Sequence, residues 1–178
     1  QEEFYAWSTF YRTKRLCNDA DISEFYYPFK LRHLPFDKRV EFIDMALESN
    51  KMKKPALIFI DGIADLINDS NDLPKSNEIV EKVMKWTDKY NLHICCIIHN
   101  TYGTKKAVGH LGSAVTKKAQ TVINIDETED NSNIFKVSHS YSRGSKFDDF
   151  YFMHDNNKKV LYQVDGQLIE LNNDKLDF

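Results

Sequence analysis

The sequence predicts an α/β fold built on a mainly parallel sheet, with flanking helices and with antiparallel strands at the C-terminal edge. Short apolar runs at 56–61 and 93–99 enclose an amphipathic helix predicted over 77–90. This strand–helix–strand order is typical of parallel sheets. Strands buried on both faces read as continuous apolar runs, and both of these runs do.

A further observation is the close spacing of the later strands. After a predicted strand at 121–125, apolar segments follow at 135–139, 147–154 and 160–164. The tetrapeptide 155–158, Asp-Asn-Asn-Lys, lies between the last two and predicts a hairpin turn. Short connections join only antiparallel neighbours, so these segments are expected at the antiparallel edge.

Helices account for most of the remaining periodicity. Ser76 is the expected N-cap of the central helix. Arg12, Lys14 and Arg15 are expected on the solvated face of the first helix. The other predicted elements are a helix over about 4–16, a strand over 29–32, a helix over about 35–49 and a helix over 113–118.

Composition limits the class of protein. The chain has 178 residues, 42% of them hydrophobic, and this is enough for one domain over residues 1–178. The net charge of −3 implies that any contact with DNA is local. The sequence has no run of 18 apolar residues, so no membrane contact is expected. Three cysteines, an odd number, favour a reducing, cytoplasmic location.

Asp61 is the first candidate functional residue. It ends the apolar run Leu57-Ile-Phe-Ile-Asp61, and open α/β sheets place their chemistry at the carboxyl ends of strands. In nucleotide triphosphatases an acid at this point holds Mg²⁺. The alternative is a core strand that ends in an Asp-Gly turn. Asp65 is expected to cap or solvate a turn.

His99 and Asn100 end the second apolar run. An imidazole or an amide at this position is able to hydrogen-bond a γ-phosphate or the attacking water. The alternative for His99 is a core histidine with its hydrogen bonds satisfied. The histidines do not have the spacing of a zinc motif.

The loop predicted over 101–112 is the candidate DNA contact. Lys105 and Lys106 are positioned to meet phosphates, and Tyr102 is able to stack on a base. Gly103, Gly109 and Gly112 are expected to let the loop rearrange. The alternative is an ordinary surface loop with solvated lysines.

Four segments together resemble a known family. They are Leu57-Ile-Phe-Ile-Asp61, Ile97-Ile-His-Asn100, Gly109-His-Leu-Gly-Ser113 with Ala119-Gln-Thr-Val122, and Ser140-Tyr-Ser-Arg-Gly144 with Phe147-Asp-Asp-Phe-Tyr-Phe152. Their order and spacing resemble the RecA-like, P-loop ATPase core of hexameric replicative helicases of the DnaB and RepA types. The most similar members are ATPases of Bacteroidetes plasmids and mobilisable elements.

The resemblance implies a function and roles for several residues. It implies a ring-forming, DNA-dependent ATPase that uses ATP and Mg²⁺ and moves on single-stranded DNA in replication, excision or mobilisation. Asp61 would be the metal-side carboxylate of the Walker B strand and His99 the γ-phosphate sensor. Arg143 would reach the ATP site of the neighbouring subunit in a homo-oligomer, expected to be a hexamer. The alternative for Arg143 is a surface arginine beside a Gly turn.

The chain also departs from this family. The phosphate-binding motif G-x-x-x-x-G-K-[ST] is absent from these 178 residues. Gln1 resembles the residue that follows the family's catalytic Glu, so we expect a truncated domain that lacks its N-terminal phosphate-binding segment and hydrolyses ATP poorly by itself. The family's lysine two residues before the arginine is replaced by Tyr141.

Two other functions stay open at this point. One is a catalytically inactive RecA-like module that binds or regulates a partner. The other is a non-motor RecA-family ATPase of the recombination-mediator type. DNA-stimulated hydrolysis and strand displacement distinguish the three.

Overall fold

The computed structural model describes residues 4–104, 106–128, 131–155 and 160–165. The chain divides into two compact units, Gln1–Lys118 (unit 1) and Ala119–Phe178 (unit 2). Unit 1 combines helices with a small parallel sheet, and unit 2 is an antiparallel sheet. The structure is therefore mixed α/β, as predicted. That residues 1–178 form one RecA-like domain stays a prediction.

The parallel sheet of unit 1 has two strands, β1 (Leu57–Asp61) and β2 (His93–Ile97). They pair in register, from Leu57 opposite His93 to Asp61 opposite Ile97. Helix α3 (Leu73–Tyr90) makes the crossover between them. The strand–helix–strand unit predicted from the sequence is confirmed, although β2 ends two residues before His99.

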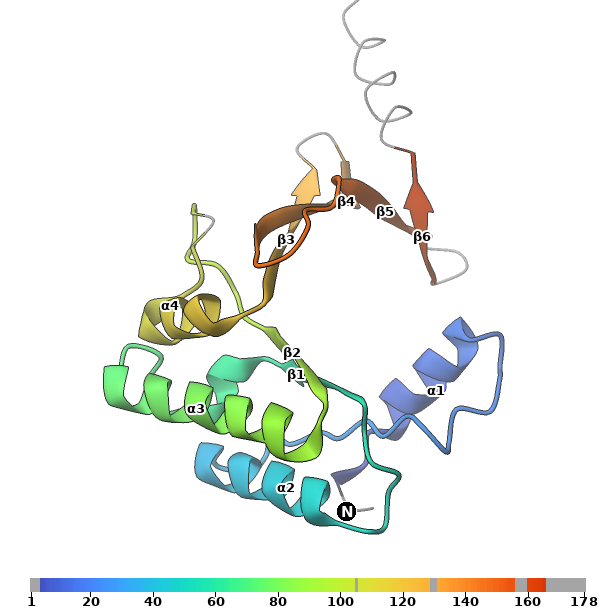
Figure 1. Cartoon of the computed structure of the whole chain (residues 1–178). Helices are drawn as coiled ribbons and strands as arrows, with labels where there is room; N and C mark the ends of the chain where they lie inside the picture. Colours follow the sequence, from blue (N-terminus) through green and yellow to red (C-terminus); the bar gives the residue numbers. More distant parts are fainter. Residues whose placement is uncertain (1–3, 105, 129–130, 156–159, 166–178) are drawn as a thin grey trace, which may run out of the picture. The chain divides into compact units, whose positions relative to one another are not determined.

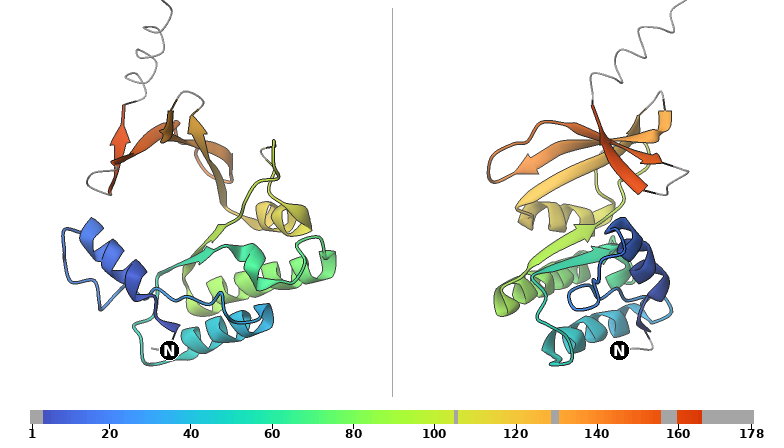
Figure 2. Two further views of the ribbon diagram at one scale, coloured as in Figure 1. Left: turned by 180° about the vertical axis from the view of Figure 1, so that it is seen from behind. Right: turned by 90° about the vertical axis from the view of Figure 1, so that its right-hand side faces the viewer.

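One face of this sheet is covered by helices. Helices α2 (Phe36–Glu48) and α3 lie side by side beneath β1 and β2 (Figures 1 and 2). Helix α4 (Gly109–Lys118) packs against α3, and the short 3₁₀ helix η2 (Ile63–Leu66) packs against α2. The buried cluster of unit 1 consists of Ile60, Ile63, Leu66, Ile67, Ile79, Val80, Trp86 and Leu111.

The other face of the β1–β2 sheet is open in the described residues. Phe59 is 63% exposed, and Leu57 and Ile97 are also exposed. The prediction that these strands are buried on both faces is wrong for the described structure, because helices cover only the face that carries Ile58 and Ile60. No third strand pairs with the outer edge of β1 or β2 in the part of the chain described.

Helix α3 begins earlier than predicted. Its N-cap is Asp72, whose carboxylate accepts the Lys75 N–H at 3.0 Å, and Pro74 lies in the first turn. The predicted cap, Ser76, is fully buried inside the helix. The predicted N-cap is therefore wrong, because Pro74 suits a first turn and Asp72 supplies a stronger acceptor.

Helix α1 (Trp7–Leu16) attaches to unit 1 through aromatic rings. Phe10 is buried and its ring lies 6.5 Å from that of Tyr26. Tyr5 packs edge-on against Phe29 at 5.8 Å, and Phe29 packs against Phe42 of α2 at 5.1 Å. The strand predicted over 29–32 is reduced to one bridge between Tyr5 and Phe29, because no longer partner segment faces it in the described residues.

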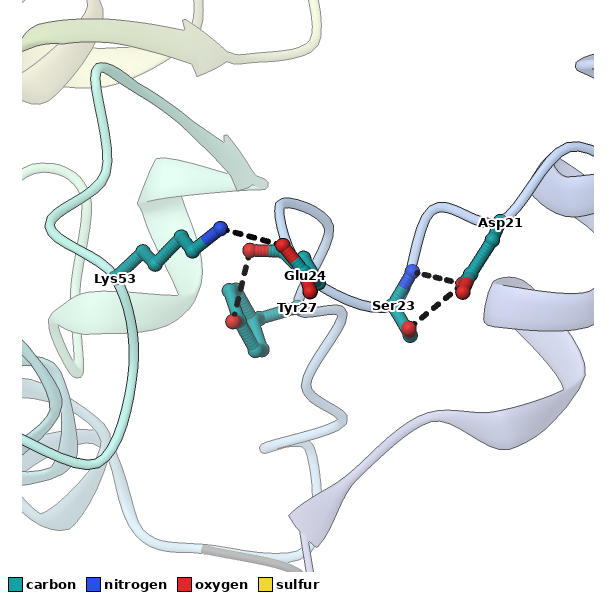
Figure 3. A network of polar contacts seen from close by, with 5 residues as sticks. All are labelled: Asp21, Ser23, Glu24, Tyr27 and Lys53. Atoms are coloured by element: carbon teal, nitrogen blue, oxygen red, sulfur yellow. Dashed lines mark hydrogen bonds and ion pairs between the residues drawn. The ribbon is translucent and has the colours of Figure 1, made fainter.

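Polar contacts hold the loop that follows α1. Figure 3 shows Lys53 donating to the Glu24 carboxylate at 2.6 Å, and Tyr27 donating to the Glu24 carbonyl at 3.0 Å. In the same loop Asp21 accepts the hydroxyl of Ser23 at 2.6 Å and its N–H at 3.0 Å. These hydrogen bonds lower the pKa of Asp21. The long loop between α1 and α2 is thus tied to the connector before β1.

Unit 2 is a four-stranded antiparallel sheet in the order β3–β4–β5–β6. The strands are β3 (Thr121–Thr128), β4 (Asn131–Ser142), β5 (Phe150–Asp155) and β6 (Val160–Val164). Four strands are antiparallel and only two are parallel, so the prediction of a mainly parallel sheet is wrong for the described strands. The hairpin turn predicted at 155–158 lies mostly outside the described residues, but β5 and β6 do pair antiparallel.

None of the helices in the described residues combines the length and the hydropathy needed to span a bilayer.

Candidate functional site

The carboxyl ends of β1 and β2 bring together the candidate residues of unit 1. Asp61 is the last residue of β1, and its register partner Ile97 is the last residue of β2. His99 and Asn100 follow Ile97 by two and three residues. Asp61, His99 and Asn100 therefore lie at the same edge of the sheet, which the sequence predicted from the direction of the two strands.

Asp61 is exposed at this edge. Its carboxylate accepts no hydrogen bond and joins no ion pair from a described residue, in contrast to that of Asp65. The peptide bond between Asp61 and Gly62 is cis. Gly62 packs closely against β2, since a Cβ at this position would lie 3.3 Å from the Ile97 carbonyl oxygen. The carboxylate thus stands beside the end of β2 and is accessible to a ligand.

Asp65, one turn further on, has a structural partner. Arg39 of α2 donates to the Asp65 carbonyl at 2.6 Å, and its guanidinium lies 3.8 Å from the Asp65 carboxylate. Arg39 also donates to the carbonyls of Leu31 and Arg32, at 3.1 and 2.9 Å. One guanidinium therefore joins α2, the loop before it and η2. Asp65 therefore has a structural contact with α2, and Arg39 is a residue that sequence reasoning missed.

His99 is exposed and lies beyond the strand. Its carbonyl accepts the N–H of Val108 at 3.1 Å, which closes the base of the loop that follows β2. The alternative of a satisfied core histidine is wrong, because the imidazole is not buried. No described residue hydrogen-bonds the imidazole, so it is accessible from the same edge as Asp61.

The loop 99–108 is a closed hairpin with a projecting tip (Figure 1). Asn100 and Ala107 form a bridge, and the Thr101 N–H donates to the Lys106 carbonyl at 2.8 Å. At the tip Tyr102 is fully exposed. Lys106 is exposed as well, and Lys105 lies outside the described residues. The loop places Tyr102 and Lys106 in solvent, where the sequence expected them.

Two glycines hold this loop in place. A Cβ on Gly109 would lie 2.6 Å from the Ser70 carbonyl oxygen, and one on Gly112 would lie 2.6 Å from Ala107. The expectation that Gly109 and Gly112 let the loop rearrange is therefore wrong, because both belong to α4 and permit close backbone packing. Only Gly103, with φ +71° and nothing near it, fits a role in loop conformation.

Ser70 links the segment after η2 to the helix that follows loop 99–108. Its carbonyl accepts the N–H of Leu111 at 3.0 Å and the hydroxyl of the buried Ser76 at 3.5 Å. The segment after η2 is thus joined to the first turn of α4 and to α3. Sequence reasoning missed this link. The sequence offered no signal for it, because Ser76 was predicted as the N-cap and lies inside the helix.

Cys95 and Cys96 of β2 are free, partly buried thiols. Burial, with a smaller contribution from Cys95, raises the pKa of Cys96 to about 11. Burial also raises the pKa of Cys95. The thiolate is the reactive form of cysteine, so the raised pKa of Cys96 disfavours it as a nucleophile at neutral pH.

Arg143 belongs to unit 2 and follows β4 directly. Its backbone N–H donates to the Gln120 carbonyl at 2.9 Å, and its Nε donates to the Ala119 carbonyl at 3.3 Å. The side chain is exposed, and it is oriented by the segment that precedes β3. The predicted contact of Arg143 with a neighbouring subunit stays a prediction.

The donor set at Asp61 limits the kind of metal site. No group of three His, Cys, Asp or Glu side chains is placed to hold a metal ion among the described residues. Mg²⁺ in phosphoryl-transfer sites is typically held by one or two carboxylates together with substrate phosphates and water. A lone, accessible carboxylate at a strand end fits Mg²⁺ bound to a nucleotide and does not fit a site made only of protein ligands.

We compared the sequence with protein families and with curated proteins. The sequence matches no protein-family model. It also matches no curated protein.

Proposed function

We propose that this chain is part of a DNA-dependent, ring-forming ATPase that acts in replication, excision or mobilisation of a plasmid or transposon. The observation that carries the proposal is the parallel register of β1 and β2. That register places an accessible carboxylate and an accessible imidazole at one sheet edge, at the base of a loop with an exposed aromatic tip. The resemblance of the four sequence segments to RecA-like helicases supports the same assignment.

Each residue has a defined task in this proposal. Asp61 would hold Mg²⁺, which when bound neutralises charge on the β- and γ-phosphates of ATP. His99, with Asn100 beside it, would donate a hydrogen bond to the γ-phosphate or orient the water. Because the His99 carbonyl closes the base of loop 99–108, a movement of His99 would shift that loop.

The loop would be the contact with single-stranded DNA. Tyr102 would stack on a base, and Lys106 with Lys105 would meet the phosphates. Arg143 would stabilise charge on the phosphates bound by an adjacent subunit, so the proposal requires a homo-oligomer, expected to be a hexamer. ATP hydrolysis also needs a phosphate-binding loop, and the proposal assigns that part to residues outside this sequence.

The decisive experiment measures ATP hydrolysis by the protein expressed from its full open reading frame, with and without single-stranded DNA. Asp61→Asn is expected to abolish turnover, because the amide holds Mg²⁺ poorly. Asp88→Asn is the matched control, since Asp88 is exposed on α3 and its carboxylate has no hydrogen-bond partner among the described residues. Equal turnover by the two variants would refute the assignment of Asp61.

A second assay separates the DNA contact from hydrolysis. Tyr102→Ala is expected to leave basal hydrolysis intact and to reduce its stimulation by single-stranded DNA, since the ring lies at the tip of the loop. Unchanged stimulation would remove Tyr102 from the DNA contact.

A second candidate function is a catalytically inactive RecA-like module. It is favoured by one observation, the lack of a G-x-x-x-x-G-K-[ST] motif within the 178 residues. This candidate predicts no turnover by the full-length protein under any condition. A non-motor ATPase of the mediator type would instead hydrolyse ATP with DNA present and displace no strand.

A further inference from the structure

Helix α1 carries an exposed aromatic pair that the proposed ATPase does not use. Trp7 is 54% exposed and Tyr11, one turn later, is 56% exposed. Their rings are close to parallel, with an interplanar angle of 28° and centroids 6.1 Å apart. Trp7 is held from behind by Tyr5 at 4.6 Å, and the buried Phe10 anchors the helix. Two large rings are therefore presented to solvent on a helix that is fixed in place.

The same helix carries three cations and no acid. Arg12, Lys14 and Arg15 lie within the ten residues Trp7–Leu16, and all three are beyond ion-pair distance of any acidic side chain in the described part of the chain. This concentration of positive charge contrasts with the net charge of −3 of the whole chain. A surface of this kind attracts anions locally.

The cations and one of the rings line a shallow hollow on the surface. Its lining residues are Ser8, Tyr11, Arg12, Lys14, Arg15 and Asp19. Asp19 is the acid of this set. Asp21 is nearby and acts electrostatically on Lys14, but its carboxylate is held by the two hydrogen bonds from Ser23. Arg12 and Arg15 are the two arginines of the hollow, and both are exposed.

We propose that the exposed face of α1 is a second binding surface for single-stranded DNA, in which bases stack on Trp7 and Tyr11 and phosphates meet Arg12 and Arg15. Positive charge interleaved with aromatic rings is the combination that binds single strands without reading their sequence. Positions 7 and 15 are about 12 Å apart along the helix, which exceeds the length of one nucleotide and fits a continuous strand. The choice of DNA over RNA rests on the proposed function.

The test uses binding alone and needs no ATP, so it succeeds or fails independently of the ATPase. Binding of a labelled oligo(dT) of about 16 nucleotides is followed by fluorescence anisotropy at several salt concentrations. The double variant Arg12→Gln/Arg15→Gln is expected to bind about tenfold more weakly. The slope of log K against the logarithm of the salt concentration is expected to be shallower by about 1.4 in this variant. Each phosphate contact on a single strand contributes about 0.7 to that slope.

The matched control removes the same charge elsewhere in unit 1. Lys54→Gln/Lys85→Gln changes two exposed lysines that form no ion pair with a described residue. It is expected to keep the salt dependence of the unmodified protein. Identical affinity and salt dependence in the two double variants would overturn the proposal.

A single variant tests the stacking independently. Tyr11→Leu is expected to weaken oligo(dT) binding about five- to hundredfold, provided that its far-ultraviolet circular dichroism is unchanged. Tighter binding of oligo(U) than of oligo(dT) through Arg12 and Arg15 would overturn the choice of DNA. Sedimentation that shows Tyr11→Leu dissociating an oligomer, with DNA binding unaltered, would instead assign this face to a contact between copies.

Discussion

The two units of this chain are built in different ways. Unit 1 has a continuous buried cluster, because α2 and α3 lie beneath the β1–β2 sheet and α4 packs against α3. In unit 2 the only buried apolar residue among those described is Val137. Its sheet is held by backbone ladders and by cross-strand pairs, such as the stacked rings of Phe135 and Phe152 at 5.1 Å. Stability in unit 1 therefore depends on core packing, and in unit 2 on strand pairing.

The largest expected effect comes from the core of unit 1. Trp86 is 3% exposed, and its indole N–H donates to Asp44 of α2 at 2.8 Å. Trp86→Ala is expected to lower the free energy of unfolding by about 3–5 kcal/mol, because it leaves a large cavity in the core. Urea denaturation followed by circular dichroism measures the change.

Ile125→Ala in β3 is the comparison in unit 2. Ile125 is 57% exposed, so Ile125→Ala is expected to lower the free energy of unfolding by about 0.5 kcal/mol or less. A cost for Ile125→Ala as large as that for Trp86→Ala would show that the two units do not differ in this way.

The next effect tests how tightly α4 packs within unit 1. Gly109→Ala is expected to cost about 1–3 kcal/mol more than Gly103→Ala in the same denaturation assay. Both glycines have positive φ, at 68° and 71°, so backbone strain is similar in the two variants. Only Gly109 has a neighbour, Ser70, in the way of a Cβ. Equal costs would mean that the contact between Ser70 and α4 is loose.

A pH dependence follows from the buried thiol of β2. The pKa of Cys96 is raised to about 11 in the folded protein, above the ordinary value of 9.0. The buried thiol contributes its full stabilisation to the free energy of unfolding below pH 9. That stabilisation is lost as the pH rises toward 11, because the unfolded chain then binds fewer protons than the folded protein. The loss is about 2 kcal/mol. Urea denaturation at pH 8 and at pH 10.5 measures this loss in the unmodified protein and in Cys96→Ala. An equal change in the free energy of unfolding in the two proteins would contradict the prediction.

The smallest effect concerns the polar pairs of unit 2. Lys136 of β4 lies 2.7 Å from the Asp149 carboxylate, and both side chains are partly exposed. Lys136→Gln is expected to cost about 0–1 kcal/mol, and less at high salt. Denaturation at two salt concentrations checks this. A cost that is large and independent of salt would indicate that unit 2 depends on a buried ion pair.

The same contrast explains which parts of the fold were predictable. The cores of α2 and α3 follow from strong helical periodicity, and β6 was predicted with its observed bounds. Helix α4 was predicted four residues too short, because Gly109 and Gly112 read as loop residues, although close packing requires them inside the helix. Strand β4 was predicted as 135–139, because its alternating serines hide the strand at its C-terminal end.

The candidate site was predictable in its position and less so in its contacts. Strand direction alone placed Asp61, His99 and Asn100 at one edge. Contacts that depend on tertiary packing leave no pattern in the sequence, so the role of Arg39 in joining three segments and the link through Ser70 were not predictable. The end of β2 was also missed, because Ile98 continues the apolar run beyond the last paired residue.

The uncovered β1–β2 sheet has a practical consequence for work with this chain. Both outer strand edges offer unpaired backbone groups beside the exposed rings and aliphatic side chains of Leu57, Phe59 and Ile97. Such edges are templates for adding strands from other molecules. Purified protein is therefore expected to aggregate as its concentration rises, and an aspartate or lysine at position 59 is the first substitution for improving its solubility.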